Sequence, residues 1–506
     1  MPRTDVSGKR SEVLILAIPG IVVLVAVAGI LWATGFDGLY GQDAFAYYDY
    51  AVGPLRSSLL RGDGLAPSFW PPGYPLLLLG FTLLTGTAPS AGQWVSLLAA
   101  CLVAVFTGLL ARELWTDPGE RPARWLTLLA GLLAALNGQL WQSSIMVTSD
   151  TSALAAVTIG TWALARYGHH PRVAWLGLAA GAVAWAVVTR WAYALVALPC
   201  LALALIEVFR QPDRRSCRQA VGVAALAVLI GASPLWAPVL SDLTSGRQNE
   251  IRFVGDFKVQ TWNPQNALRR DFFTSDGQLH YRLPNGLYYA VAPARWFYLT
   301  PIIAPFMGLG LIHLYRNPSA ARWLLLVAWP LTVYGFHAGA PWQIFRFTLA
   351  YLPPLAILAA LGLSVSFSSR RFKRLVVLVC VVGMAAMLWS AGNLALAQVR
   401  RKEAHMAVVR WTQTQVPRNA TLVTFGLTAT FRHYASLDTR ELYDLTDTDL
   451  ERLLHGDRPV FLLLESAGFE RQWSRMRPGR NYRLLRDGGH LLPRSSRAGY
   501  DLYAIR

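Results

Sequence analysis

Long apolar runs recur along most of this chain, and they constrain its fold more than any other feature. A transmembrane helix needs about 20 apolar residues to cross the hydrocarbon core of a bilayer. Charged residues make up 15% of the 506 residues, well below the ~25% of a typical soluble domain. We therefore predict a mainly α, polytopic helical membrane protein. Its eleven candidate spans are 12–34, 90–112, 124–142, 151–167, 173–189, 191–209, 219–240, 297–315, 323–338, 347–367 and 375–396.

Basic residues gather in the short loops between these spans, and they set the topology, because Arg and Lys near span ends favour the cytoplasmic side. The clusters are Arg3/Lys9/Arg10, Arg112/Arg121/Arg124, Arg166/Arg172, Arg210/Arg214/Arg215/Arg218, Arg316/Arg322 and Arg370/Arg371/Lys373/Arg374. If residues 71–86 do not cross, every cluster falls inside. We therefore predict a cytoplasmic N-terminus. The predicted outer segments are 35–89, 143–150, 241–296, 339–346 and the tail from 397 onward.

The net charge of +18 has the same explanation. In a soluble protein such a charge would suggest nucleic acid. Here the basic residues lie in short loops and in the polar tail, so we predict no nucleic-acid partner. Only four of the 47 basic residues are Lys. That bias is typical of GC-rich bacterial genomes, and the predicted location is a bacterial inner membrane.

The segment SFWPPGYPLLLLGFTLLTG, residues 68–86, is apolar but short. If it crossed the membrane, every later basic loop would face outward, against the positive-inside trend. We therefore predict a juxtamembrane or re-entrant helix in the first outer loop, which packs against protein or lies in the interface. The pair Pro71-Pro72 suits a helix start, where a missing N–H costs nothing.

Residues 397–506 are polar, and we predict that they form a domain separate from the transmembrane domain at 1–396. Apolar residues in this tail alternate between the periods of helices and of strands. The predicted helices are near 403–415, 427–435, 446–455 and 467–476, and the predicted strands are 421–425, 460–465, 481–486 and 501–505. The pattern indicates a small extracytoplasmic α/β domain.

Four aspartates lie in the first outer loop: Asp37, Asp43, Asp49 and Asp63. Asp43 directly precedes the helix-like stretch AFAYYDYAVGPL, just outside the first span. A carboxylate there can act as general base on an acceptor hydroxyl, so Asp43 is a candidate catalytic residue. An N-cap role is the structural alternative for an acid at this place. Asp49 and Asp63 are better explained as structural.

Asp150 is a second candidate acid, at the end of MVTSD and before the run TSALAAVTIG. The topology puts it at the outer surface and at a helix N-terminus. A capping role is an equally good explanation for it. Two carboxylates from separate loops at one membrane face can nevertheless frame one site.

Two arginines stand apart from the cytoplasmic clusters. Arg190 lies between two apolar runs in VVTRWAYALVALP, and Arg346 lies at the outer edge of a span in PWQIFRFTLAYLPPLA. Snorkelling is the structural alternative. An isolated cation at the membrane edge is still a functional candidate, and guanidinium binds phosphate through two parallel hydrogen bonds. An anionic lipid phosphate is the expected partner.

The outer loop 241–296 mixes cations with aromatic residues, which suits a cleft for phosphate and sugar. Its candidate binding residues are Trp262, Arg269 and Arg270, and it also contains Arg252, Lys258, Arg282, Arg295, Tyr281, Tyr288, Tyr289 and Trp296. A solvated loop with interfacial aromatic anchors is at least as good an explanation for each single residue. His280 and His337 are lone histidines, more often structural than catalytic. A metal site stays unknown, because no ligand spacing indicates one.

Several motifs together resemble one known group of enzymes. They are the acid-led helix QDAFAYYDYA after the first span, the stretch RGDGLAPSFWPPGYPLLL, the later acid of MVTSDTSALAA, the Arg-Phe of FRFTLAYLPPLAIL, and the polar tail. The chain resembles the GT-C-fold glycosyltransferases that use polyprenyl-phosphate sugars. The nearest groups are the bacterial aminoarabinose (ArnT-like) and protein O-mannosyltransferase-like enzymes. The resemblance covers residues 12–396 as architecture, and 43–77 is its most specific part.

That resemblance implies transfer of a sugar from a polyprenyl-phosphate donor to a lipid, glycan or protein acceptor on the outer face of the membrane. It implies that Asp43 is the catalytic base. The family commonly has two adjacent acids at this point, whereas Asp43 is followed by Ala44, so Asp150 is the candidate second carboxylate. Tyr47, Trp70 and Tyr74 are further candidate substrate-binding residues.

Two other classes of protein remain as alternatives. A transporter or flippase of lipid-linked sugars would be expected to show inverted repeats and broken spans with buried charges near mid-membrane. The sequence shows no repeat, and its notable charges cluster at one face. A non-catalytic scaffold whose tail binds a partner is the third possibility, and only an assay of sugar transfer separates the three.

Overall fold

The structure, a computed structural model, describes residues 6–66, 68, 70–115, 124–211, 213–236, 261–367 and 373–506. The chain divides into two compact units. The helical unit comprises Met1–Leu39, Ala46–Ala267 and Asn285–Leu396. The C-terminal unit comprises Ala397–Arg506 together with two short segments, Tyr40–Phe45 and Leu268–Pro284, which come from the predicted outer loops.

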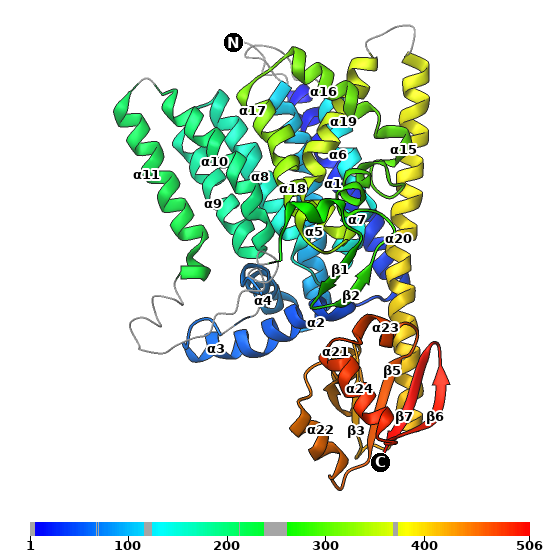
Figure 1. The fold of residues 1–506 in the computed structure, drawn as a ribbon. Helices are drawn as coiled ribbons and strands as arrows, with labels where there is room; N and C mark the ends of the chain where they lie inside the picture. The colour runs from blue at the N-terminus through cyan, green and yellow to red at the C-terminus, as the bar shows by residue number, and fades with distance from the viewer. Residues whose placement is uncertain are drawn as a thin grey trace. The chain divides into compact units, whose positions relative to one another are not determined.

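The helical unit consists of a bundle of long helices, with shorter ones packed among them and at its ends (Figure 1). The long helices are α1 (Val6–Thr34), α5 (Ser90–Trp115), α8 (Asp150–His169), α9 (Val173–Thr189), α10 (Ala194–Phe209), α11 (Arg214–Gly231), α19 (Leu352–Phe367) and α20 (Lys373–Gln415). The shorter ones are α2 (Gly41–Tyr50), α3 (Arg56–Arg61), α4 (Gly73–Thr85), α6 (Arg124–Ala135), α7 (Gly138–Ser144), α14 (Asn285–Ala290), α15 (Thr300–Ile303), α16 (Phe306–Arg316), α17 (Ala320–Trp323) and α18 (Trp329–Gly339). Helices α2 and α20 contribute residues to both units.

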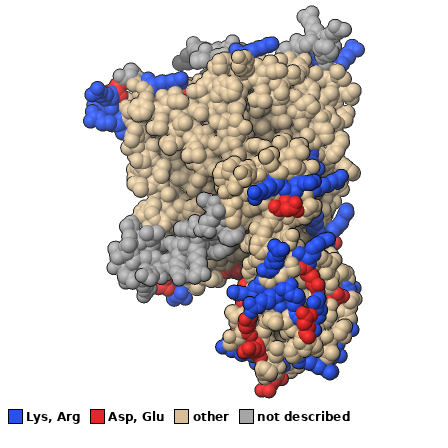
Figure 2. Space-filling view, viewed as in Figure 1, with Lys and Arg blue, Asp and Glu red and all other residues tan. Residues whose placement is uncertain are grey.

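The predicted membrane architecture is confirmed in its main features. Five of the described helical segments are long and apolar enough to cross a membrane, and further apolar helices are shorter. Within the bundle, α8 packs against α5 and α9, α9 also packs against α11, and α16 packs against α19. Figure 2 shows the surface of this bundle as mostly tan, with few charged side chains, as expected for helices that face lipid.

Helix α4 is the element formed by the WPPGYP segment. Its 13 residues correspond to a length of about 20 Å, against the ~30 Å thickness of the hydrocarbon core. The helix packs against α5 and α9. Gly73 permits the close approach to α9, because a Cβ at this position would lie only 2.6 Å from Oγ1 of Thr189.

One predicted span is interrupted at an identifiable residue, and the predicted break between the spans 173–189 and 191–209 is found at Arg190. The span at 124–142 divides at Asn137, whose side chain accepts a hydrogen bond of 3.0 Å from the backbone N–H of Leu140 and so starts α7. The chain between α9 and α10 becomes extended at Arg190 and then forms a short 3₁₀ turn. These breaks place Asn137 and Arg190 at helix ends, where the side chain of Arg190 can bind groups outside its own helix.

The C-terminal unit is built on a five-stranded sheet of order β4-β3-β5-β7-β6. The strands are β3 (Thr421–Thr424), β4 (Asp438–Glu441), β5 (Val460–Glu465), β6 (Leu491–Arg497) and β7 (Tyr500–Ile505), and the helices are α21 (Thr428–Tyr434), α22 (Asp447–Leu454), α23 (Phe469–Trp473) and α24 (Arg477–Asp487). Strand β3 pairs in parallel with β4 and β5, whereas β7 pairs antiparallel with β5 and β6. A separate hairpin, β1 (Asp271–Thr274) and β2 (Gly277–His280), belongs to the same unit.

The neighbouring parallel strands β3 and β5 are buried on both faces of the sheet. This is expected for parallel strands covered by helices. Leu422 and Leu463 belong to one apolar cluster, which includes Val408 and Val409 of α20. Their chain neighbours Val423 and Leu462 belong to the other cluster, under α23 and α24. Alternate residues of each strand thus belong to two apolar cores, one on each face of the sheet.

The prediction of a small α/β domain in the tail is confirmed, with two corrections. Residues 481–486 form part of helix α24 rather than a strand. The predicted span 375–396 and the predicted helix near 403–415 are one continuous helix, α20. Strands β4 and β6 were not expected from the sequence. Residues 241–260 of the second outer loop, with Arg252 and Lys258, lie outside the described residues.

Candidate active site

Asp150 is the first residue of α8 and is almost fully buried, with 3% of its surface exposed. The residue before it, Ser149, makes no side-chain cap. Oδ1 of Asp150 instead lies 3.1 Å from Nη1 of Arg190. Its other oxygen, Oδ2, accepts no hydrogen bond from any described residue. A buried carboxylate with one paired and one unpaired oxygen is costly, so this arrangement points to function.

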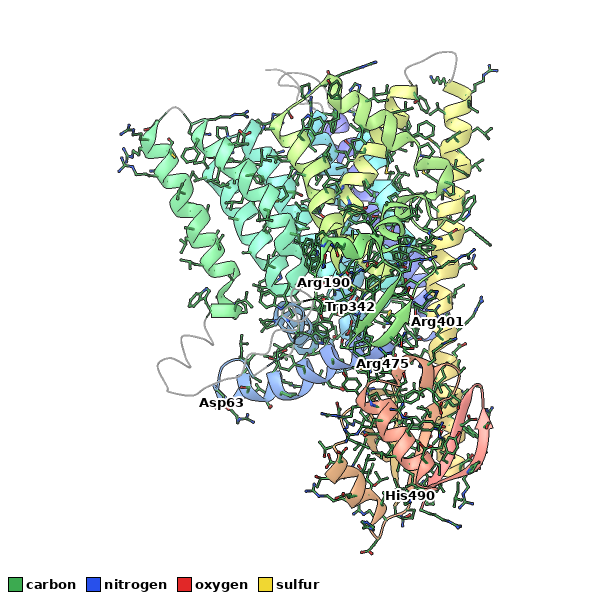
Figure 3. The ribbon with its side chains drawn as sticks, in the orientation of Figure 1. Asp63, Arg190, Trp342, Arg401, Arg475 and His490 are labelled. Carbon is green, nitrogen blue, oxygen red and sulfur yellow. The ribbon has the colours of Figure 1, made fainter. Side chains whose placement is uncertain are left out.

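Arg190 is held in place by the break that follows α9. Its extended backbone ends the helix and directs the guanidinium toward the start of α8, where Nη1 also donates to Oγ of Ser149 at 3.3 Å. The side chain is 16% exposed, so it does not snorkel into solvent. Figure 3 labels Arg190 among the clustered side chains, and it labels Asp63 at the surface, where that residue pairs with Arg61.

Aromatic side chains from α2 and α4 adjoin this ion pair. The hydroxyl of Tyr47 shares a hydrogen bond of 2.9 Å with Oγ of Ser149. The ring of Tyr47 lies 5.2 Å from that of Tyr74 and 6.0 Å from that of Trp70. Tyr74 is fully buried and donates from its hydroxyl to the carbonyl of Gly92 at 3.0 Å. The WPPGYP segment therefore forms a wall beside Ser149 and Arg190.

Arg346 joins the same neighbourhood through one shared ring. The guanidinium carbon of Arg190 lies 5.6 Å from the centre of the Phe347 ring, and that of Arg346 lies 6.0 Å from it. The imidazole of His337 stacks on Phe347 at 4.7 Å, and Tyr289 lies 5.7 Å from His337. Two arginines and a buried histidine thus surround one aromatic side chain.

The other predicted binding residues are placed elsewhere. Trp262 is 40% exposed, and its indole N–H donates to the carbonyl of Phe336 at 3.0 Å. Arg269 and Arg270 are exposed and belong to the C-terminal unit, next to the β1–β2 hairpin. The backbone carbonyl of Arg270 accepts from the N–H of Tyr281 at 2.9 Å. The loop predicted as one cleft therefore divides between the two units.

Asp43 lies in the first turn of α2, on the short segment that belongs to the C-terminal unit. In that unit, the ring of Tyr40 lies 5.2 Å from that of His405, and the ring of Phe45 lies 5.7 Å from that of His433. Burial lowers the pKa of His405 and raises the pKa of Tyr40. The start of α2 is thus held by aromatic contacts to α20 and α21.

Sequence reasoning missed three side chains of this neighbourhood. Ser149 precedes Asp150 in MVTSD, Phe347 follows Arg346, and His337 was given a structural role because it stood alone in the sequence. Ser149 and Phe347 could have been found because each is the chain neighbour of a candidate residue. Among the described residues, no group of three or more His, Cys, Asp or Glu side chains could hold a metal ion.

No protein-family model matches the sequence, and no curated protein is similar to it. Solved structures do match. ArnT from Cupriavidus metallidurans bound to undecaprenyl phosphate is 13% identical, with 97% of each chain covered and a TM-score of 0.59. The same protein in the apo state is 12% identical, with 98% of each chain covered and a TM-score of 0.60. The archaeal oligosaccharyltransferase AglB from Archaeoglobus fulgidus, in complex with an inhibitory peptide and a dolichol-phosphate, is 12% identical over 92% of this chain and 70% of its own, with a TM-score of 0.56. The chain therefore has the GT-C fold.

Proposed function

We propose, from the GT-C fold and the buried site at the ends of α8 and α9, that this protein is a membrane glycosyltransferase. It would transfer a sugar from a polyprenyl-phosphate donor to a lipid, glycan or protein acceptor on the outer face of a bacterial inner membrane. The N-terminus would lie in the cytoplasm and the C-terminal unit outside. The observation that supports this proposal most is the Asp150–Arg190 pair, which shares the Phe347 ring with Arg346.

Arg190 and Arg346 are the proposed ligands of the donor phosphate. Each guanidinium can donate two parallel hydrogen bonds to phosphate oxygens. Two of the similar structures contain undecaprenyl phosphate and dolichol-phosphate, respectively, which supports a lipid phosphate as the anion. As the sugar leaves the phosphate, negative charge grows on the bridging oxygen, and the fixed arginines would stabilise that charge.

Asp150 is proposed to be the second carboxylate of the site and to position Arg190. Its Oδ1 fixes one edge of the guanidinium. The remaining guanidinium nitrogens stay available to a phosphate. Ser149 and Tyr47 hold the same edge through their mutual hydrogen bond.

Asp43 is the proposed general base. It stands four residues before Tyr47 on α2, and residues four apart share one helix face. In the proposed reaction, Asp43 takes the proton of an acceptor hydroxyl as the acceptor oxygen bonds to the anomeric carbon. The bond from that carbon to the phosphate oxygen breaks, and polyprenyl phosphate leaves. A single displacement of this kind inverts the anomeric centre.

The aromatic residues Tyr47, Trp70 and Tyr74 are proposed to line the donor site, since apolar rings suit both a prenyl chain and a sugar face. Trp262, Arg269 and Arg270 remain proposed acceptor or donor contacts from the second outer loop. Trp262, Arg269 and Arg270 are secondary to Arg190 and Arg346 in this proposal, because their described contacts are to other parts of the chain.

The base assignment is tested by Asp43→Asn in the purified full-length protein, with incorporation of radiolabelled sugar from a polyprenyl-phosphate donor as the readout. General-base catalysis is worth about 10²- to 10⁴-fold, so transfer should fall by at least about 100-fold. The matched control is Asp49→Asn, on the same helix, which should keep its rate. A folded Asp43→Asn variant with full transfer activity would falsify the assignment.

A further inference from the structure

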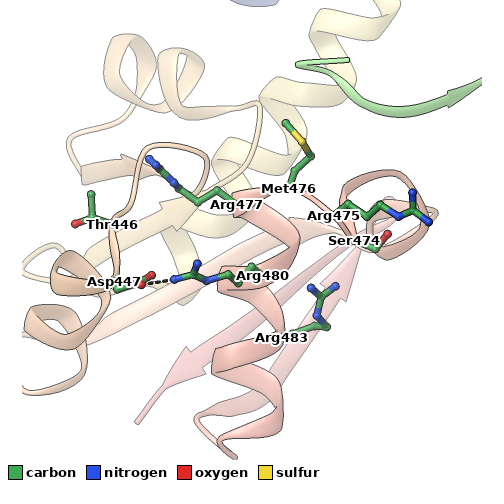
Figure 4. A pocket seen from close by; sticks show the side chains of 8 residues that line it. All are labelled: Thr446, Asp447, Ser474, Arg475, Met476, Arg477, Arg480 and Arg483. Atoms are coloured by element: carbon green, nitrogen blue, oxygen red, sulfur yellow. Dashed lines mark hydrogen bonds and ion pairs between the residues drawn. The ribbon is translucent and has the colours of Figure 1, made fainter. Parts of the chain in front are cut away.

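Four arginines line one pocket of about 450 Å³ on the C-terminal unit (Figure 4). They are Arg475, Arg477, Arg480 and Arg483, from the start of α24 and the residues just before it. Asp447, at the start of α22, is the single acidic residue among those that line the pocket. The pocket therefore has a large excess of positive charge.

Most of this charge is not neutralised by the protein. Arg480 pairs with Asp447. Arg475, Arg477 and Arg483 make no ion pair with any other described residue. By contrast Arg486, on the same helix, pairs with both Glu470 and Asp487. Like charges gathered in a concave site raise the local concentration of anions.

The two helix starts that border the pocket are capped differently. At α22, Thr446 and Asp449 form a complete capping box, so the backbone N–H groups of these two residues have partners within the protein. At α24, Met476 is the N-cap and makes no side-chain cap. No acid lies in the first turn of α24. The positive end of its helix dipole is therefore not offset by a capping side chain or an acid, and it adds to the attraction for an anion.

The pocket is held in shape without a ligand. Gly479 lets the first turn of α24 approach the end of α23, because a Cβ there would lie 2.1 Å from the carbonyl oxygen of Trp473. Asn481 is fully buried and donates to the carbonyls of Leu442 and Leu445 at 3.2 and 2.9 Å. These contacts tie α24 to the residues before α22. A preformed site loses less ordering entropy when it binds.

We propose that this pocket binds a phosphate group, as inorganic phosphate or on a sugar or lipid headgroup. A phosphate monoester carries up to two charges and three acceptor oxygens, which suits three unpaired guanidiniums and a helix N-terminus better than the single charge of a carboxylate. The inference does not depend on the proposed transferase activity.

The test measures phosphate and pyrophosphate binding to the full-length protein in a neutral detergent by titration calorimetry. The double variant Arg477→Gln/Arg483→Gln removes two unpaired cations and should bind at least about tenfold more weakly, since tenfold corresponds to about 1.4 kcal/mol. Arg486→Gln is the matched control on the same helix and should bind like the wild type. Asp447→Asn should bind more tightly, because it removes the one acid.

Equal binding by the wild type and by a folded double variant overturns the proposal. So does absence of binding by the wild type at about 10 mM phosphate, a concentration that would detect even very weak sites. Two further titrations identify the source of the phosphate. Glucose 6-phosphate binding more tightly than inorganic phosphate indicates a sugar phosphate, and tighter binding of micelles that contain phosphatidic acid, whose headgroup is a phosphate monoester, indicates a lipid headgroup. Either preference must be lost in the double variant.

Discussion

Arginine serves different purposes in the two units of this protein. In the helical unit, Arg190 is buried, paired with Asp150 and placed over Phe347. In the C-terminal unit, Arg477 is exposed and makes no ion pair with a described residue. A buried and paired guanidinium has a fixed direction, so it can orient one bound group. An exposed cluster has little directional control but attracts many anions. The first arrangement suits chemistry, and the second suits capture.

Breaking the buried pair should have the largest effect on stability. Arg190→Met leaves Asp150 buried without a partner, which costs ~3–5 kcal/mol for a buried pair. Arg480→Met breaks an exposed pair, for which the cost is ~0–1 kcal/mol. Thermal unfolding of the full-length variants in detergent measures both. The comparison fails if the two variants lose the same stability.

The double variant Arg190→Met/Asp150→Leu separates the ion pair from the packing around it. Removing both charges avoids the unpaired carboxylate, so most of the lost stability should return. Sugar transfer should stay abolished, because the proposed phosphate ligand is absent. Recovery of activity in this variant would place Arg190 outside the chemistry.

Replacing arginine with lysine should have an intermediate effect, and it should differ between the buried site and the exposed pocket. Arg346→Lys keeps the charge but loses the planar pair of donors. One charge-assisted hydrogen bond is worth about 1.5–3 kcal/mol, so kcat/KM for the donor should fall by about tenfold or more. Arg483→Lys is the control in the exposed pocket. It should leave sugar transfer unchanged, and a loss there equal to that of Arg346→Lys would contradict the distinction.

The smallest expected effect concerns one carboxylate of the C-terminal unit. Burial raises the pKa of Glu441, although Thr428 Oγ1 donates to it at 2.8 Å. The folded state therefore favours the protonated form, and this stabilisation is present below the ordinary Glu pKa and is lost as the pH rises. Glu441→Gln resembles the protonated form. Its melting temperature should slightly exceed that of the wild type at about pH 8 and match it at about pH 4. A lower melting temperature at the higher pH would show that the charged carboxylate is needed.

Charge placement in the sequence predicted part of the candidate site. The predicted topology puts Arg190 on the outer side, away from the other basic residues, and this exception makes it a candidate. Arg346 was selected for the same reason, and both lie near Phe347. The pairing of Arg190 with Asp150 could not be predicted, because it depends on how α8 and α9 pack. The stacking of His337 on Phe347 and its contact with Tyr289 could not be predicted either, because these residues are distant in sequence.

The error at α24 has a physical cause. The residues NYRLLR show Tyr482 and Leu484 alternating with polar side chains, which favoured a strand. The buried positions are instead Pro478, Gly479, Asn481 and Leu485, and three of them, Pro478, Asn481 and Leu485, recur at helical spacing. Pro478 near the helix start was the signal that could have corrected the prediction. A buried asparagine concealed the helical period because polar residues are normally taken as exposed.

Gly73 limits how far this sequence can diverge during evolution. Any side chain there would meet Oγ1 of Thr189 at 2.6 Å and its backbone at 2.9 Å, and it would force α4 away from the residue beside Arg190. Distant relatives of this chain that keep the site should therefore retain this glycine even where overall sequence identity is low. A search pattern that joins this glycine to the later arginine would recover relatives that whole-chain sequence comparison misses.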